Sequence, residues 1–476
     1  MVGAGIAGLA AAWELRHHAG VTVFDPGPPG GKLRTTDFGG RPVDEGPDAF
    51  VTRAPEGVDL CGELGLAGDL TGPAVGRTLL WQRGRLRVLP EGLLLGVPRK
   101  LTTVATSGLL SPAGALRAGL DLVLPRRAIG PDVSVGSLVR ARFGSQVADG
   151  LVDPLIGGIH AACIDDLSAN LTAPELLAVA RRSRSLLLGL RSARPGGGGA
   201  GGALFLAPRA GMGALVERLV SSLAAGGVEM RASAVTAVRC GASGRVELDG
   251  GGLGSSSGLG SSSGLGSSTG LDGPVLHEAE FDGAVLAVPA AAAARLLGPA
   301  APEGLGRIET TSVCVVTMAF PVAELPAPPG VNGILVPAGE GRLMTACSFG
   351  SSKWPHWANL GTTVVRVSAG RHGDTRALEL DDGSLVDRLA GEVAEALGAP
   401  ARPSGARVSR WPASFPLYRV GHAALVERIE EELAAGFARR VALAGATYRG
   451  AGIPACIASG RRAARHVLAA AAPGAG

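Results

Sequence analysis

MVGAGIAGLAAAWEL, residues 1–15, decides the fold of this 476-residue chain. Its glycines at positions 3, 5 and 8 have the spacing of a dinucleotide-binding turn between a strand and a helix. Gly3 makes the turn, Gly5 lets the backbone approach a pyrophosphate, and Gly8 lets the helix pack closely on the sheet. The helix N-terminus offers unpaired amides and a favourable dipole to that pyrophosphate. The stretch therefore predicts an ADP-containing cofactor at the start of the chain.

The residues after the turn support this interpretation, with one exception. Residues 21–24 read as a second strand, and it ends on Asp25, about 20 residues after the turn, where a carboxylate accepts the ribose hydroxyls. A carboxylate at this point argues against a 2′-phosphate on the ribose. The exception is the first strand, which should supply about five apolar residues, whereas only Met1 and Val2 precede Gly3. Either translation starts upstream of Met1, or this central strand is a stub.

Composition limits the class of protein. The length allows two or three domains, and an apolar content of 46% excludes wholesale disorder. The net charge of +4 comes from scattered arginines, since lysine occurs only at 32, 100 and 353, and no basic run is interleaved with aromatic rings for nucleic acid. Six cysteines without CxxC spacing or histidine partners predict reduced thiols, no metal and a cytoplasmic location. We expect no signal peptide and at most peripheral membrane contact.

Strand and helix patterns continue along the chain. Residues 92–195 read as helical, and further helices are expected over 211–225, 384–397 and 422–435. Strands are expected at 284–288, 313–320, 333–336 and 364–367. Residues 250–273, a near-repeat of Gly, Ser and Leu, read as an expanded hairpin loop. The end of the chain, from 441, reads as strand, glycine turns and helix, so both termini are expected to hold one cofactor.

Several further motifs resemble one group of flavoenzymes. GGKLRT, residues 30–35, and EGPDAF, residues 45–50, are similar to the FAD-binding signature that amine oxidases, phytoene desaturases and porphyrinogen oxidases share. Segments within residues 142–168 resemble the helical-domain signature of porphyrinogen oxidases. SSKWPH, residues 351–356, and PLYRVGH, residues 416–422, resemble the Gram-positive branch, and residues 445–460 resemble the flavin-contacting end. Except for the Gly/Ser insert, the whole chain thus resembles the oxygen-dependent protoporphyrinogen/coproporphyrinogen III oxidase family.

The resemblance implies a fold class and a division into domains. The fold would be α/β, of mixed α+β kind and amine-oxidase-like architecture. It would combine a Rossmann-like FAD-binding domain, a mixed-sheet substrate domain and a helical subdomain. The implied boundaries are 1–75, 203–290 and 425–476 for the FAD-binding domain, 76–95 and 291–424 for the substrate-binding domain, and 96–202 for the helical subdomain.

The resemblance also implies an enzyme of haem biosynthesis that oxidises coproporphyrinogen III to coproporphyrin III. The substrate would lose six electrons in three steps, with non-covalent FAD as cofactor, O2 as acceptor and H2O2 as product. The flavin carries the difficult chemistry, and the sequence offers no convincing triad or acid/base pair, so we assign no catalytic residue. The expected partners are the small-molecule porphyrinogen and O2, and other enzymes of the haem pathway remain open as partners.

The expected FAD contacts combine the glycine turn and Asp25 with positions that the resemblance implies. The full set is Gly3, Gly5, Ile6, Ala7, Gly8, Asp25, Lys32, Gly46, Pro47, Asp48, Ala49, Val235, Trp411, Gly452, Ile453 and Pro454. By residue type alone, Val235 and Trp411 would be ordinary core. Arg53 and Arg77 are candidates to bind the propionates of the substrate. His160, Tyr418 and His422 could border the macrocycle, although a lone histidine more often has a structural role.

Departures from the family pattern leave alternatives open. His160 to Cys163 read HAAC where the family usually has YAGD, Leu417 replaces a usual glutamine, and Ala54 replaces a frequent basic residue. The enzyme could instead oxidise protoporphyrinogen IX, an amine or a polyene. Cys456 follows the GIP motif, where no covalent flavin is expected. A non-catalytic porphyrin-binding relative is the remaining alternative, motivated by the short first strand.

Overall fold

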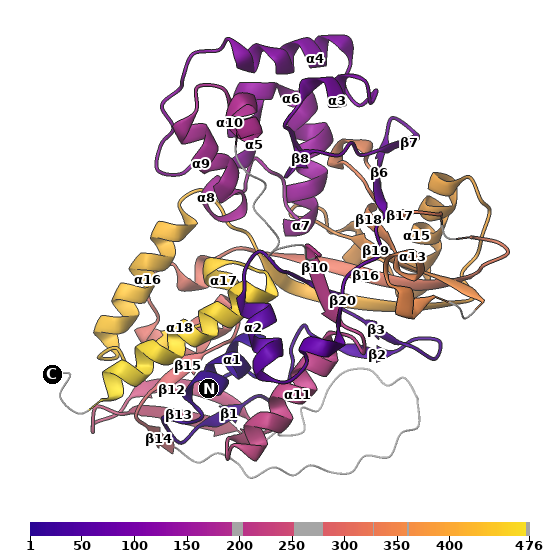
Figure 1. Ribbon diagram of the computed structural model, residues 1–476. Helices are drawn as coiled ribbons and strands as arrows, with labels where there is room; N and C mark the ends of the chain where they lie inside the picture. Colours follow the sequence, from indigo (N-terminus) through magenta and orange to yellow (C-terminus); the bar gives the residue numbers. More distant parts are fainter. Residues whose placement is uncertain (193–202, 252–278, 327, 359–360, 473–476) are drawn as a thin grey trace.

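The first residues of the chain lie at the centre of a parallel sheet. The structure is a computed structural model that describes residues 1–192, 203–251, 279–326, 328–358 and 361–472 (Figure 1). In it, β1 (Thr22–Phe24) pairs with β11 (Glu229–Arg231), and β15 (Ala284–Leu286) pairs with β21 (Val441–Leu443), all in parallel. Val2 bridges Phe24 on one side and Leu286 on the other. The expected central strand is therefore present as a stub, held by backbone hydrogen bonds to both neighbours.

Two helices from opposite ends of the chain cover this sheet. α1 (Ile6–Leu15) has nine of its ten residues buried, and α18 (Ile453–Ala471) packs directly against it. α11 (Met212–Ala225) and α2 (Glu56–Glu63) complete the layer around the same hydrophobic cluster. The strand–turn–helix patterns expected at the two termini are thus confirmed and lie side by side (Figure 1).

A second, seven-stranded sheet is mixed, as expected. Its strands run in the order β20 (Gly405–Pro416), β16 (Thr310–Pro321), β19 (Thr362–Ala369), β18 (Met344–Phe349), β17 (Val331–Leu335), β6 (Arg77–Gln82) and β7 (Arg85–Val88). Only the β17–β6 pair is parallel among its described pairings. α15 (Asp382–Leu397) packs on this sheet through Leu385, Leu389 and Val393, which share one hydrophobic cluster with its strands.

Helices with a hydrophobic cluster of their own form the end of the molecule opposite to β1 and α11 (Figure 1). They are α3 (Leu101–Ala105), α4 (Pro112–Gly119), α5 (Val135–Phe143), α6 (Ser145–Val147), the π-helical segment Ala148–Gly157, α7 (Gly158–His160), α8 (Ala169–Thr172), α9 (Pro174–Arg182) and α10 (Leu186–Ser192). Within the described ranges, the structure contains no helix of sufficient length and apolar character to cross a bilayer.

The remaining elements connect these layers. They are β2 (Thr35–Asp37), β3 (Pro42–Asp44), β4 (Phe50–Val51), β5 (Leu70–Thr71), β8 (Leu93–Leu94), β9 (Val97–Pro98), β10 (Phe205–Pro208), β12 (Ala234–Cys240), β13 (Val246–Gly251), β14 (Ala279–Phe281), α12 (Ala290–Leu297), α13 (Gly350–Lys353), α14 (Arg376–Glu379), α16 (His422–Gly436) and α17 (Ala446–Arg449). Most of the Gly/Ser insert, 250–273, lies outside the described residues, which leave out 252–278, but β13 and β14 on either side pair antiparallel. The α/β class is confirmed, whereas the exact domain boundaries stay a prediction.

Candidate cofactor and substrate site

The glycine turn has the shape that a pyrophosphate needs. A Cβ on Gly8 would lie 2.0 Å from the Gly3 carbonyl oxygen, and one on Gly3 would lie 2.6 Å from the Ala287 oxygen. Both positions are therefore closed to larger residues by the backbone. A Cβ on Gly5 would meet no described atom within 4 Å. Gly5 is also the N-cap of α1 and makes no side-chain cap, so open space lies over amides that can bind an anion.

Asp25 accepts hydrogen bonds from the glycine turn and from the residues that follow β1. One carboxylate oxygen accepts a hydrogen bond from the Ala4 amide at 2.7 Å, and the other accepts one from the Gly27 amide at 2.8 Å. These two bonds fix the carboxylate at the end of β1 beside the glycine turn. Each oxygen keeps a second lone pair, so the ribose contact stays a prediction. Val235, expected at the adenosine end, lies in β12 opposite Gly250 and is half-buried.

The GGK loop lies directly against the turn. The Gly30 amide donates to the Ala4 carbonyl at 2.8 Å, and a Cβ on Gly31 would touch the Gly5 Cα at 3.4 Å. Lys32 then donates through Nζ to the Ser414 carbonyl at the end of β20. Its side chain keeps access to solvent, yet desolvation by the surrounding protein lowers the pKa of its amine. Lys32 thus connects the GGK loop to the end of β20.

The hairpin after this loop is tied to α11 by a buried carboxylate. Asp44, which ends β3, accepts a hydrogen bond from the Met212 amide at 2.8 Å and one from the Thr35 hydroxyl. It thereby satisfies an amide in the first turn of α11. Burial raises the pKa of Asp44 from 3.8 to about 6, although Thr35 and Arg366 act in the opposite direction.

This shift predicts a pH dependence of stability. A carboxyl whose pKa is raised in the folded state stabilises the fold fully below its unfolded pKa, and that contribution is lost as the pH rises through 6. Asn keeps the acceptor oxygen and does not titrate. We therefore expect the stability of Asp44→Asn, relative to the parent protein, to improve by about 2 kcal/mol between pH 4.5 and pH 7.5. Urea unfolding of both proteins at the two pH values measures this change, and an unchanged difference would contradict it.

The turn at residues 45–49 meets the substrate sheet. Trp411 of β20 donates through Nε1 to the Glu45 carbonyl at 3.2 Å. A Cβ on Gly46 would lie 2.3 Å from the Lys32 carbonyl oxygen and 3.6 Å from the Trp411 ring. Lys32, Gly46 and Trp411, which were expected to share the cofactor, are thus brought together from two distant parts of the chain.

The C-terminal glycine turn closes the same region from the other side. Gly445 and Gly450 have φ values of +121° and +142°, which residues with a side chain rarely adopt. Gly452 caps α18 without a side-chain cap, and Pro454 stands in the first turn of that helix. Burial raises the pKa of the Cys456 thiol to about 11, while the nearby Lys32 lowers it. The absence of covalent attachment at Cys456 stays a prediction.

The three residues expected at the macrocycle form one aromatic cluster. The ring of Tyr418 lies 5.9 Å from that of His160 and 5.1 Å from that of His422, centroid to centroid. The Tyr418 hydroxyl donates to the Ala446 carbonyl, and His422 Nε2 lies 3.0 Å from the Thr447 oxygen. Burial lowers the pKa of His160 to about 4, so its imidazole is neutral near pH 7.

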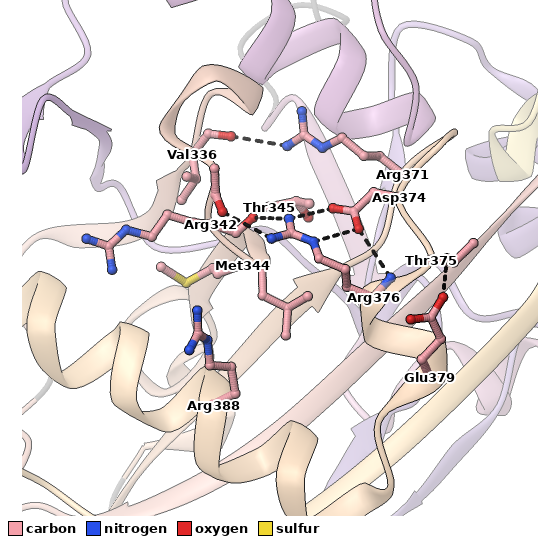
Figure 2. A network of polar contacts seen from close by, with 12 residues as sticks. Val336, Arg342, Met344, Thr345, Arg371, Asp374, Thr375, Arg376, Glu379 and Arg388 are labelled. Atoms are coloured by element: carbon pink, nitrogen blue, oxygen red, sulfur yellow. Dashed lines mark hydrogen bonds and ion pairs between the residues drawn. The ribbon is translucent and has the colours of Figure 1, made fainter.

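The HAAC loop that departs from the family pattern is held by a second polar network. The His372 amide donates to the Ala161 carbonyl at 2.7 Å, and Arg371 Nη1 lies 3.6 Å from Asp153 Oδ2. Figure 2 shows the polar contacts of the segment that follows Arg371. Asp374 pairs with Arg376 at 2.7 Å, and Arg376 donates to the Arg342 carbonyl at 3.2 Å. The loop is thereby anchored to the segments that follow β19 and precede β18, two inner strands of the seven-stranded sheet.

The two candidate propionate ligands do not converge. Arg53 forms an ion pair with Glu175 of α9 at 3.1 Å, which links the end of β4 to the helices. Arg77 begins β6, is exposed, and is separated by four strands from the β20 strand that carries Trp411. Both assignments stay predictions, and no described contact joins Arg77 to the cluster of Lys32, Gly46 and Trp411.

Residue-by-residue reasoning missed three side chains around Asp48. Lys353, Trp354 and Arg366 all approach the same carboxylate oxygen, at 2.9, 3.1 and 3.3 Å. The SSKWPH motif was the available signal for the first two, but it gave no role for them. Arg366 lies inside β19 and has no motif around it, so only the fold reveals it.

Comparison with known proteins gives full-length matches. A family model described as flavin containing amine oxidoreductase matches residues 6–468. The coproporphyrinogen III oxidase of Mycobacterium tuberculosis is 33% identical, and the match covers 98% of this chain and 96% of that protein. The coproporphyrinogen III oxidase of Bacillus subtilis is 29% identical, with 98% and 97% covered. A solved structure from Exiguobacterium sp. 255-15, provisionally described as a protoporphyrinogen oxidase, superposes with a TM-score of 0.84 at 27% identity, covering 98% of each chain.

Proposed function

Because the chain belongs to the flavin-containing amine oxidoreductase family, we propose that it is an FAD-dependent oxidase that converts coproporphyrinogen III to coproporphyrin III. O2 is the acceptor and H2O2 the product, and the reaction belongs to haem biosynthesis. The observation that carries the proposal is the end-to-end match to two coproporphyrinogen III oxidases. A non-catalytic relative is disfavoured because the FAD motifs and their packing are intact.

FAD is the cofactor, and the residues present fit it. The open space over Gly5, the N-termini of α1 and α18 without side-chain caps, and the Lys32 amine suit an anionic dinucleotide between the two terminal turns. When bound, the flavin supplies acceptance of two electrons from a C–H bond and their transfer to O2. We assign Gly3 to Gly8 and Asp25 to the ADP part, and Lys32, the turn 46–49, Trp411 and residues 452–454 to the flavin part.

The protein's own groups bind, orient and exclude water. Tyr418 and His422 are buried, and the Tyr418 hydroxyl and His422 Nε2 are bonded to backbone oxygens, so they back an apolar wall and supply no charge to the substrate. His160 is neutral for the same reason of burial. An apolar wall of this kind suits a flat macrocycle, whose propionates must reach cations at the rim. We propose Arg53 for that role and leave Arg77 as the weaker candidate.

Protoporphyrinogen IX is the second candidate substrate, favoured by the resemblance to the Exiguobacterium structure. The two substrates differ in charge, since coproporphyrinogen carries four propionates and protoporphyrinogen two. Oxygen uptake and porphyrin fluorescence should be recorded side by side with both compounds. The proposal requires a higher kcat/KM for coproporphyrinogen III. A clear preference for protoporphyrinogen IX, or turnover only with an amine or a polyene, would overturn it.

A further inference from the structure

Lysine is scarce in this chain, and two of its three lysines lie at the cofactor site. The 45 basic residues include only Lys32, Lys100 and Lys353. Lys32 reaches Ser414, and Lys353 reaches Asp48 in the turn beside it, whereas Lys100 is exposed before α3. At these two positions the cation is a compact ammonium, whereas arginine, with its planar guanidinium, serves almost everywhere else in the chain.

Lys353 takes part in a partly buried charge cluster. Its Nζ lies 2.9 Å from Asp48 Oδ2, and the same oxygen accepts a hydrogen bond from Trp354 Nε1 at 3.1 Å. Arg366 Nη1 stands 3.3 Å from it, with side-chain exposures of 8% for Arg366 and 17% for Asp48. Burial alone would raise the pKa of Asp48, but Lys353 and Arg366 outweigh it and hold that pKa well below the usual range. Asp48 is therefore an anion with two cations fixed around it.

The cluster is coupled to the backbone of the turn. Arg366 also donates through Nη2 to the Gly46 carbonyl, and Trp411 holds the neighbouring Glu45 carbonyl. A Cβ on Gly46 would lie 2.3 Å from the Lys32 carbonyl oxygen, so the turn also packs closely against the GGK loop. Contacts from α13, β19 and β20 thus fix one short piece of chain from the side of the substrate sheet.

We propose that Lys353 is a positioning residue for the reaction. Its ion pair with Asp48 holds the turn 45–49, and through it the flavin end of the cofactor, in the orientation that the porphyrinogen requires. The inference rests on the proposed placement of this turn along FAD. It goes beyond that placement because it assigns the SSKW segment, in and just after α13, a role in aligning the cofactor with the substrate.

Three variants of the holoenzyme test this role. Lys353→Met removes the ammonium and keeps most of the stem, Lys353→Arg keeps the charge without the compact shape, and Lys100→Met makes the same change at an exposed site. We expect Lys353→Met to retain FAD, because the pyrophosphate contacts are untouched, but to shift the visible spectrum of the bound flavin. Its kcat should fall about ten- to a hundredfold, the loss that a displacement near 1 Å can cause, with KM changed less than about twofold. The kcat and the flavin spectrum of Lys353→Arg should lie between those of Lys353→Met and the parent protein. Those of Lys100→Met should match the parent protein.

The outcomes distinguish a role of Lys353 in positioning the cofactor from a role in the stability of the fold alone. A Lys353→Met protein with a lower melting temperature but an unchanged flavin spectrum and kcat would overturn the proposal. If Lys353→Met yields no holoenzyme, the Lys353→Arg variant is the test. A flavin spectrum and a kcat like those of the parent protein in that variant would show that charge alone suffices, and would overturn the requirement for lysine. The spectrum does not depend on the substrate. Failure of the parent protein to oxidise coproporphyrinogen would therefore refute the proposed function and leave the spectral comparison valid.

Discussion

Gly5→Val is expected to weaken FAD binding about a hundredfold while leaving the fold intact. Gly5 has an extended conformation, with φ −69° and ψ 171°, that valine adopts without strain, and its Cβ would enter empty space. That space is where the pyrophosphate must approach the first amides of α1. Losing two hydrogen bonds to a charged group costs about 3 kcal/mol, which is about a hundredfold in affinity.

Titration of the apoprotein with FAD, followed by flavin fluorescence, measures the effect. Gly20→Val is the matched control, because Gly20 also has no described atom within 4 Å of an added Cβ but lies exposed between α1 and β1. The control should bind FAD like the parent protein. Parent-like affinity in Gly5→Val would contradict the position assigned to the pyrophosphate.

Gly460→Ala and Gly391→Ala are expected to change stability in opposite directions. A Cβ on Gly460 of α18 would lie 2.0 Å from the Ala7 oxygen and 3.1 Å from the Ala11 nitrogen, both backbone atoms of α1. The two helices would have to separate, at a cost of about 3 kcal/mol. Gly391 of α15 is exposed and has no described atom within reach, so alanine there should stabilise the helix by about 1 kcal/mol.

Thermal unfolding of both variants, with and without added FAD, tests this contrast. The single methyl group is the same in both, so a difference in sign isolates the close approach of α1 and α18. Because these helices carry the two glycine turns, Gly460→Ala should also release FAD at a lower temperature than the parent protein. Equal effects at both sites would contradict the close packing of the helices.

Local patterns in the sequence were sufficient to predict the fold of the cofactor-binding part of the chain. The glycine spacing at 3, 5 and 8 and the apolar run at 313–320 report constraints between neighbours along the chain, and the structure confirms the elements they predict. The short first strand was also visible. How this short strand is held in the sheet was not visible, because the pairing of Val2 with both Phe24 and Leu286 depends on residues far away in the sequence.

The candidate site was predictable where a motif repeats a family signature and not elsewhere. Lys32 was named from its motif and Trp411 from the family resemblance, but only the fold shows that Lys32 contacts Ser414 and that Trp411 contacts Glu45. Arg366 could not be found at all, since an arginine in the middle of an apolar strand carries no local signal until Asp48 and Gly46 come beside it. Charge clusters assembled from several elements are in general invisible to a local pattern.

The most direct test of the central claim is the stoichiometry of the reaction with coproporphyrinogen III. Purified protein that retains FAD should be mixed with this compound while O2, H2O2 and porphyrin are followed together. A six-electron oxidation predicts three O2 consumed and three H2O2 formed for each coproporphyrin III released. No porphyrin formed by a protein that holds its full complement of FAD would contradict the account.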